Sequence, residues 1–350
     1  MATPDLTAVL QPFAPLDDGD GPQRPERLTV SPLAGGLIND TFALGRGFVL
    51  QRLHPIFRPT VNLDIAALTP VLRSAGVPVP EIVAAGDGRP WVEIADPEHP
   101  LCGAWRILTR LPGTTLHRLA NREQARAAGA MVARFHAALR GSSHAFHFSR
   151  PGAHDTARHL RLLGEALADH PDHRLEAPVR ALATELQARW QAWGALPTLP
   201  ERVIHGDLKV SNLLFAGDAV VGVIDLDTMA RGTLDVELGD ALRSWCNAAA
   251  EDDPAPRFLP DVCEAALAGY LTVAGDWLTV SERRAILPGV ERICLELAAR
   301  FAADALSETY FGWDPQRFAT RGDHNLIRAR NQLGLARDVA TVRRANPIPL

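Results

Sequence analysis

The sequence has few of the residues and patterns that mark secreted, membrane-spanning or metal-binding proteins. Its four cysteines, Cys102, Cys246, Cys263 and Cys294, stand far apart and lack the paired spacing of a metal site. We therefore expect buried thiols in a reducing compartment. No hydrophobic run approaches the roughly 20 residues that a membrane helix needs.

Neither acidic nor basic residues are in large excess. The formal net charge is −5, from 36 basic and 41 acidic residues, and gives no indication of a nucleic-acid-binding surface. The opening stretch, MATPDLTAVLQPFAPLDDGDG, lacks the basic-then-apolar order of a secretory signal. These features predict a cytoplasmic globular protein that binds neither nucleic acid nor membrane, and we expect a monomer or homodimer.

The expected secondary structure changes about one third of the way along the chain. After a turn-rich leader (1–25), strand-like segments fill 26–52, a helix is expected over 62–76, and AWRILTRL (104–111) is a further strand. Helical patterns then dominate 121–141, 155–194, 235–250, 259–273, 282–306 and 324–337. The LPG at 111–113 separates the two parts. We therefore predict an α+β protein with a β-rich lobe over 26–110, a helical lobe over 111–350, and a cleft between them.

One strand-like stretch interrupts the helical part: VIHGDLKVSNLLFAGDAVVGVIDLDT (203–228). Its polar side chains stand where apolar runs begin or end: His205, Asp207, Lys209, Asn212, Asp225 and Asp227. Carboxylate and amide oxygens that converge at strand ends suit Mg²⁺. A carboxylate free of the metal can accept a proton from a substrate hydroxyl, and an ammonium can neutralise a transferring phosphoryl group. Each residue alone could decorate a turn, but the joint pattern favours phosphoryl transfer.

HGDLKVSN together with VIDLD resembles the aminoglycoside phosphotransferase and choline kinase group, whose members are relatives of protein kinases. The resemblance implies a bilobal kinase-like fold, with Asp207 as catalytic base and Asn212 and Asp225 as Mg²⁺ ligands. His205 would brace the loop. Asp227 is either a second metal ligand or a turn residue, and Lys209 either meets the γ-phosphate or lies on the surface.

The same resemblance implies that ATP lies under a β-hairpin loop. LAGGLINDTFAL (33–44) is placed for this role, with Gly35, Gly36, Asn39 and Thr41 as candidate contacts. FVLQR has Gln51 and Arg52 where kinases have the strand lysine, and strand alternation allows only one of them to face the cleft. The following helix offers Asp64 and no glutamate as a partner. RILTRLPG (106–113) would be the hinge, with the backbone from Thr109 to Leu111 contacting adenine.

Four shorter sequence segments bear on the identity of the acceptor. GLINDT, FVLQRL, VIDLDT and GDALRS resemble the bacterial N-acetylhexosamine 1-kinase branch, and the likeness extends over roughly residues 30–340. It implies that Arg300 and Tyr310 contact a sugar together with Asp207, and that its anomeric hydroxyl is phosphorylated. Kinases of other alcohols (an aminoglycoside, choline, homoserine or another sugar) share the catalytic loop, and a catalytically silent kinase-like protein is the remaining alternative.

Overall fold

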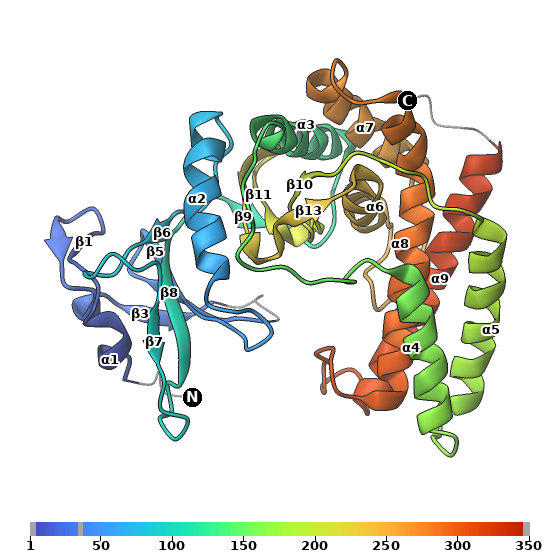
Figure 1. The fold of residues 1–350 in the computed structure, drawn as a ribbon, viewed down its shortest axis with the longest axis horizontal. Coiled ribbons are helices and arrows are strands. Elements are labelled where there is room, and N and C mark those ends of the chain that lie inside the picture. Colours follow the sequence, from blue (N-terminus) through green and yellow to red (C-terminus); the bar gives the residue numbers. More distant parts are fainter. Residues whose placement is uncertain (1–4, 34–37, 346–350) are drawn as a thin grey trace.

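The computed structural model describes residues 5–33 and 38–345 and shows a β-rich lobe beside a larger helical lobe (Figure 1). Gly35 and Gly36 lie outside the described residues. The β-rich lobe contains a six-stranded antiparallel sheet in the order β3-β4-β5-β8-β6, with β7 also paired to β8. Its strands are β3 (Val30–Pro32), β4 (Asp40–Leu44), β5 (Phe48–Arg52), β6 (Ile82–Val83), β7 (Val92–Ile94) and β8 (Gly103–Thr109).

Strand alternation divides the side chains of this sheet between two faces. Leu50, Trp105 and Ile107 are buried in an apolar cluster on one face. Thr41, Gln51 and Arg106, which pair across β4, β5 and β8, point to the other face, on the side of α2 (Val61–Ser74). The sheet therefore has one apolar face and one polar face, and the polar face is turned toward α2 and the helical lobe.

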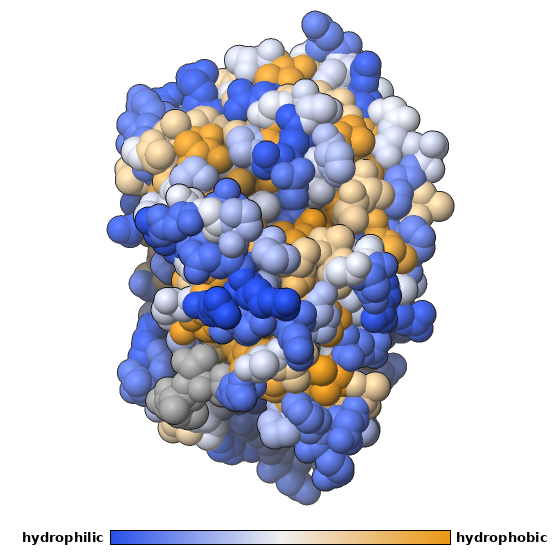
Figure 2. Space-filling view, turned by 90° about the vertical axis from the view of Figure 1, so that its left-hand side faces the viewer, coloured by the Kyte–Doolittle hydropathy of each residue, from blue (hydrophilic) through white to orange (hydrophobic). Residues whose placement is uncertain are grey.

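The leader packs onto the apolar face of this sheet. It contains α1 (Thr7–Leu10), the short hairpin of β1 (Leu16–Asp17) and β2 (Pro22–Gln23), and a turn of 3₁₀-helix at Pro25–Arg27. Leu6, Val9, Leu10 and Phe13 are buried in the same cluster as Leu50 and Trp105 because their spacing puts them on one side of the chain. Residues 5–25 thus belong to the β-rich lobe. Figure 2, which faces this lobe, shows hydrophilic residues between small apolar groups.

The helical lobe is built around a long central helix, α8, which packs against α4, α5, α6 and α9, while α3 packs against α7 (Figure 1). Its helices are α3 (Arg122–Leu139), α4 (Thr156–Asp169), α5 (Glu176–Trp193), α6 (Leu234–Trp245), α7 (Pro260–Ala274), α8 (Val280–Ser307) and α9 (Arg321–Ala345). The predicted helix over 155–194 is two helices, α4 and α5, separated by a turn at residues 170–175 that contains Pro171.

Two short sheets lie where the lobes meet. β10 (Arg202–Ile204) pairs with β13 (Ala230–Gly232), and β11 (Leu213–Ala216) pairs with both β12 (Ala219–Val223) and β9 (Thr114–Thr115). The chain therefore enters the helical lobe directly after the LPG at 111–113. Among the described residues, no helix combines the length and apolar character needed to cross a membrane.

Candidate active site

The loop between β10 and β11 and the turn after β12 bring four of the predicted residues together. Lys209 Nζ lies 2.5 Å from Asp207 Oδ2 and 3.8 Å from Asp225 Oδ2. Asn212 Nδ2 donates to the carbonyl oxygen of Asp207 at 2.7 Å and to its Oδ2 at 3.1 Å. Asp207 and Asp225 therefore face each other across one ammonium group, and all of these side chains keep some solvent exposure except the buried Asn212.

The pKa values of Asp207, Lys209 and Asp225 depend on one another's charges. Burial alone would raise the pKa of Asp207, but the charge and hydrogen bond of Lys209 outweigh it and hold that pKa below its usual range. Burial likewise opposes the charge of Lys209, yet Asp207 and Asp225 raise its pKa. The pKa of Asp225 is raised, first by burial and then, against the attraction of Lys209, by the carboxylates of Asp227 and Asp207. A cation bound beside Asp225 would relieve this repulsion.

Two backbone positions at the site, Gly206 and Asp225, have positive φ. Asp225 has φ 66° and ψ 56°, in the left-handed region that few residues other than glycine adopt. Gly206 has φ 80°, and a Cβ there would lie 2.5 Å from the carbonyl oxygen of Thr228. The loop at 205–212 and the turn at 225–228 are therefore in direct backbone contact, which explains the glycine in the HGD sequence.

Glu237, on α6, binds the backbone of the loop at His205 and Gly206. Its Oε1 accepts from His205 N at 2.7 Å and lies 3.0 Å from His136 Nε2, and its Oε2 accepts from Gly206 N at 2.9 Å. The His205 ring is buried, with Nε2 2.9 Å from the Ile224 carbonyl oxygen. This geometry supports the bracing role expected for His205, and Glu237 is a supporting residue that the sequence patterns did not reveal.

Glu237→Ala should destabilise the protein by about 3–5 kcal/mol, because it leaves buried N–H groups and His136 without their acceptor. The pKa of Glu237 is lowered because His136 outweighs the effect of burial, so its stabilising contribution is present above the unfolded pKa of about 4.3 and is lost as pH falls through the folded value. Urea unfolding at neutral and acidic pH measures both effects. A loss no larger than that of Glu264→Ala, an exposed glutamate on α7, would contradict this role.

A buried arginine connects the two lobes beside this loop. Arg106 on β8 pairs with Asp227 through both nitrogens, Nη1 to Oδ1 at 2.5 Å and Nη2 to Oδ2 at 2.9 Å. Its Nη2 also donates to Gln51 Oε1 at 2.7 Å, and its Nη1 donates to Asn62 Oδ1 of α2 at 3.1 Å. Both Arg106 and Asp227 are almost fully buried. The polar face of the sheet therefore carries a buried cation on β8, and this cation pairs with Asp227.

This network bears on the roles left open for several residues. Asp227 Oδ2 also accepts from Asn39 Nδ2 at 2.8 Å, so both carboxylate oxygens are engaged, and the arrangement favours a lobe-joining role over a second metal ligand. Gln51 faces Arg106 and Thr41, whereas Arg52 lies on the opposite face beside Asp40 and the Cys102 carbonyl group. Arg106 and Asn62 were missed in the sequence, where the one usable signal was an arginine inside an otherwise apolar strand.

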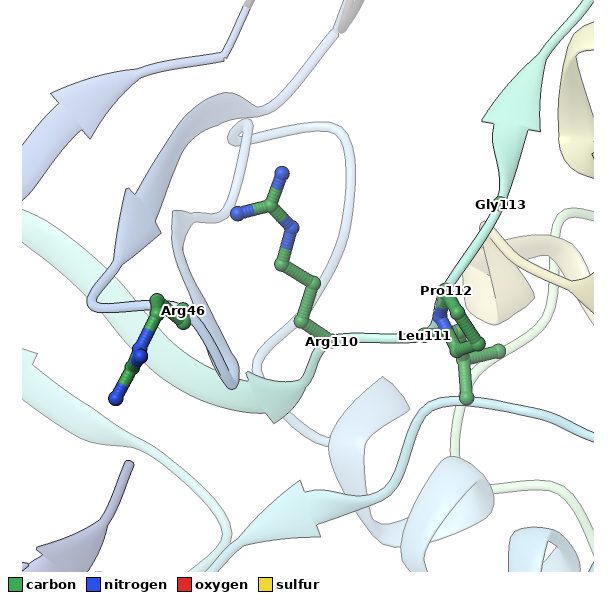
Figure 3. Close-up of a pocket in the computed structure, with 5 residues that line it drawn as sticks. All are labelled: Arg46, Arg110, Leu111, Pro112 and Gly113. Atoms are coloured by element: carbon green, nitrogen blue, oxygen red, sulfur yellow. The ribbon is translucent and has the colours of Figure 1, made fainter. Parts of the chain in front are cut away.

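The hinge follows the end of β8. Thr109 N donates to the Glu81 carbonyl oxygen and Thr109 Oγ1 accepts from Glu81 N, both at 2.9 Å, so its backbone N–H is used within the β-rich lobe. A cavity of about 400 Å³ next to the hinge is lined by Arg46, Arg110, Leu111, Pro112 and Gly113. Figure 3 shows Arg46 and Arg110 on the β-rich side and the chain from Leu111 to Gly113 leading into the helical lobe. Of the predicted adenine contacts Thr109 and Leu111, Leu111 is therefore the one that lines this cavity.

A second cavity, of about 380 Å³, lies between α4, α8 and the segment after α8, and both predicted acceptor residues line it. Arg300 lies over the Phe311 ring at 5.5 Å, and Arg150 Nη2 donates to Tyr310 Oη at 2.9 Å. Asp304 holds the segment by accepting backbone hydrogen bonds from residues 309–311. Arg150, Arg158 and His159 also line this cavity, which is therefore rich in hydrogen-bond donors.

His154 follows the cavity-lining residue Ala153 in the chain. Burial opposes a charge on His154, but the buried Glu296 outweighs it and raises the histidine's pKa. His154 therefore pairs with Glu296 next to Ala153, which lines the cavity.

Comparisons with known proteins fit this architecture. A homoserine kinase from Methylorubrum populi is 36% identical over 173 residues, a match that spans about half the chain (49%) and about half of that relative (49%). The structure of a microcompartment-associated aminopropanol kinase has a TM-score of 0.60 at 18% identity, covering 93% of this chain and 95% of that one. An amicoumacin kinase in complex with AMP-PNP and Ca²⁺ has a TM-score of 0.57 at 18% identity, covering 91% and 89%.

The two structural neighbours establish a kinase-like bilobal fold, as the sequence predicted. None of the three names refers to an N-acetylhexosamine, so the predicted sugar-kinase branch stays a proposal. Residues 29–277, which include the six-stranded sheet, the loop at 205–212 and the Asp225 turn, match the phosphotransferase enzyme family. The chain belongs to this family.

Proposed function

We propose that the protein is an ATP-dependent kinase that transfers the γ-phosphate to a hydroxyl group of a small molecule. The observation that carries this proposal is the convergence of Asp207, Lys209, Asn212 and Asp225 at one edge of the cleft. An all-oxygen donor set with an electrostatically strained carboxylate fits Mg²⁺. Asn212 directs its Nδ2 to Asp207, which leaves its Oδ1, with Asp225, to hold the ion. The bound ion would neutralise charge on the phosphates.

In this mechanism Asp207 orients the acceptor. Its lowered pKa keeps the carboxylate ionised near neutral pH, so it accepts a hydrogen bond from the acceptor hydroxyl and aligns that oxygen with the γ-phosphorus. The acceptor oxygen then bonds to phosphorus, the bond to the ADP oxygen breaks, and the hydroxyl proton passes to an Asp207 carboxylate oxygen. Lys209, which stays protonated between two carboxylates, stabilises charge on the transferring group.

We propose the anomeric hydroxyl of an N-acetylhexosamine as the acceptor. Local sequence likeness to the N-acetylhexosamine 1-kinase branch supports this choice, and Arg300 and Tyr310 line the same cavity. A cavity of about 380 Å³ with an aromatic residue and several donors has the composition expected for a monosaccharide site.

Homoserine is the second candidate acceptor, favoured by two observations. Curated relatives that match parts of the chain are named homoserine kinase. The guanidinium groups of Arg150, Arg158 and Arg300 line the cavity, and guanidinium groups bind carboxylates in bidentate geometry. The same positive charge disfavours a polycationic aminoglycoside.

An ADP-release assay with Mg²⁺ over N-acetylglucosamine, N-acetylgalactosamine, homoserine, choline and an aminoglycoside tests the proposal. We expect acceptor-dependent ADP release that is highest with an N-acetylhexosamine. Highest activity with homoserine would replace the sugar by the second candidate. No ADP release with any acceptor or with water, by a protein that binds ATP, would favour a catalytically silent nucleotide-binding protein.

Arg300→Met should raise the KM for the acceptor about 10- to 100-fold and change the KM for ATP little, because a charged hydrogen bond contributes about 1.5–3 kcal/mol. Steady-state kinetics with each substrate varied in turn separate the two constants. Arg161→Met, which removes an exposed arginine on α4, is the matched control and should leave both constants unchanged. An unchanged acceptor KM in the Arg300 variant would move the acceptor away from this cavity.

A further inference from the structure

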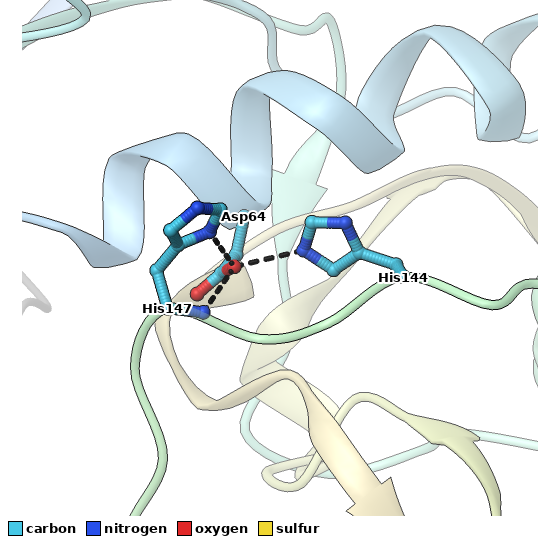
Figure 4. Close-up of side chains that lie close together, drawn as sticks. All are labelled: Asp64, His144 and His147. Atoms are coloured by element: carbon cyan, nitrogen blue, oxygen red, sulfur yellow. Dashed lines mark hydrogen bonds and ion pairs between the residues drawn. The ribbon is translucent and has the colours of Figure 1, made fainter.

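Away from the catalytic loop, two imidazoles converge on one buried carboxylate. Asp64 Oδ1, on α2, lies 2.8 Å from His144 Nε2 and 2.9 Å from His147 Nδ1 (Figure 4). The histidines belong to the segment between α3 and α4, in the sequence HAFH (144–147). Asp64 is almost fully buried, whereas His144 is 14% and His147 48% exposed, so the cluster is open to solvent on the histidine side.

The three donor atoms have the identity and approximate spacing of a transition-metal site. Two imidazole nitrogens and a carboxylate oxygen are ligands typical of Zn²⁺, and a tetrahedral site with bonds of about 2.0–2.1 Å holds its donor atoms about 3.4 Å apart. The present 2.8 and 2.9 Å separations would have to open by about 0.5 Å to admit the ion. The exposed His147 ring can make that adjustment, and water can take the fourth position.

The carboxylate is held in place without the imidazoles. Asp64 Oδ1 accepts from His147 N at 2.8 Å, and Oδ2 accepts from Phe148 N at 3.0 Å. These backbone bonds orient the carboxylate toward the two rings. When a metal occupies the site, each ring would coordinate through the nitrogen that now faces Asp64 and carry its proton on the other nitrogen.

We propose that Asp64, His144 and His147 form a second cation site, selective for Zn²⁺ or a similar transition metal over Mg²⁺. Imidazole ligands provide this selectivity, because Mg²⁺ prefers oxygen donors. The bound ion fastens α2 of the β-rich lobe to the segment 144–148 of the helical lobe. Nothing in this inference depends on the acceptor or on phosphoryl transfer.

The site is positioned to influence the cleft. Figure 1 shows the segment between α3 and α4 running from beside α2 across the helical lobe to α4. Its later residues, Arg150 and Ala153, line the acceptor cavity. The same α2 helix also contributes Asn62 to the Arg106 network. A metal at Asp64 would therefore restrain both the lobe-joining helix and the segment that borders the acceptor.

Titration of the metal-free full-length protein with Co²⁺ and Zn²⁺ in excess Mg²⁺ tests the site. We expect one equivalent of Co²⁺ to produce the visible absorption bands of a tetrahedral centre with nitrogen ligands, and Zn²⁺ to displace it. Zn²⁺ should also raise the thermal unfolding temperature. Excess Mg²⁺ is included to occupy the proposed oxygen-ligand site at Asp225, so that Co²⁺ at that site does not contribute to the absorption spectrum.

The double variant His144→Ala/His147→Ala should lose the absorption bands and the Zn²⁺-dependent stabilisation, and its metal-free unfolding temperature verifies that it folds. His147→Ala alone, at the more exposed position, should weaken binding at least tenfold and covers the case in which the double variant does not fold. His170→Ala/His173→Ala removes the other H-x-x-H pair of the chain and should bind as the wild type does. Equal Co²⁺ spectra and equal Zn²⁺ stabilisation in the wild type and the His144/His147 variants would overturn the proposal and leave only hydrogen bonds to Asp64.

Discussion

Asp207→Asn should reduce turnover by about 10²-fold or more while the protein folds normally. Asparagine has the size of aspartate and can still accept hydrogen bonds from Lys209 and Asn212, but it cannot take a proton from the acceptor hydroxyl. It also removes the negative charge that the lowered pKa of Asp207 maintains near neutral pH. The kcat from ADP release, with thermal unfolding measured beside it, tests the prediction.

The matched control is Asp218→Asn, in the exposed turn between β11 and β12, where the carboxylate accepts a surface hydrogen bond from Asn121 at 2.8 Å. This variant should retain wild-type turnover. Near-native turnover of the Asp207 variant would contradict the assignment of Asp207 as the base. A loss of turnover with an equal loss of stability in the Asp207 variant would show that the residue acts through folding.

Arg106→Met should destabilise the protein by about 3–5 kcal/mol and raise the KM for ATP. It leaves the buried carboxylate of Asp227 with Asn39 as its remaining hydrogen-bond donor and no cation, and such an uncompensated buried charge is costly. It also removes the hydrogen bonds that join Gln51 and Asn62 to the turn that carries Asp225. Urea unfolding and steady-state kinetics with ATP varied measure the two effects.

A matched control variant and a double variant test this prediction further. Arg52→Met alters the next strand along the sheet on the opposite face, where the guanidinium is partly exposed, and should cost less than about 1 kcal/mol. Arg106→Met/Asp227→Asn removes both charges and should recover part of the stability lost in the single variant. Equal stability losses for Arg106→Met and Arg52→Met would mean that the Arg106–Asp227 pair does not join the lobes.

Prediction from the sequence was most successful where local chemistry and periodicity carry the information. Helix α2 was predicted over 62–76 and is observed at Val61–Ser74, and α7 was predicted over 259–273 and is observed at Pro260–Ala274. The H-x-D-x-K-x-x-N spacing placed Asp207, Lys209 and Asn212 on one loop, where the structure shows them. Such short-range relations follow from backbone geometry, because a loop of six residues limits how far its side chains can separate.

Asp227 shows where this kind of prediction ends. It follows Asp225 by two residues, and the sequence could not distinguish a second metal ligand from a turn residue. In the structure a 3₁₀ turn at Leu226–Thr228 directs the two carboxylates to different neighbours, Asp225 toward Lys209 and Asp227 toward Arg106. Arg106 lies more than a hundred residues earlier in the chain, so no local pattern relates the two.

The sequence by itself predicted a β-rich part followed by a helical part, most helices, and the candidate residues that the structure brings together around Asp207, because periodicity and short spacing are local properties of the chain. Only the tertiary structure decided which distant residues meet. Gln51, and not Arg52, lies on the polar face of the sheet, and Arg106 pairs with Asp227. Asp64 lies beside His144 and His147. These contacts depend on the register of β4, β5 and β8 and on how α2 packs against the helical lobe. Register and packing are set by the burial of the whole core, which one segment of sequence does not specify.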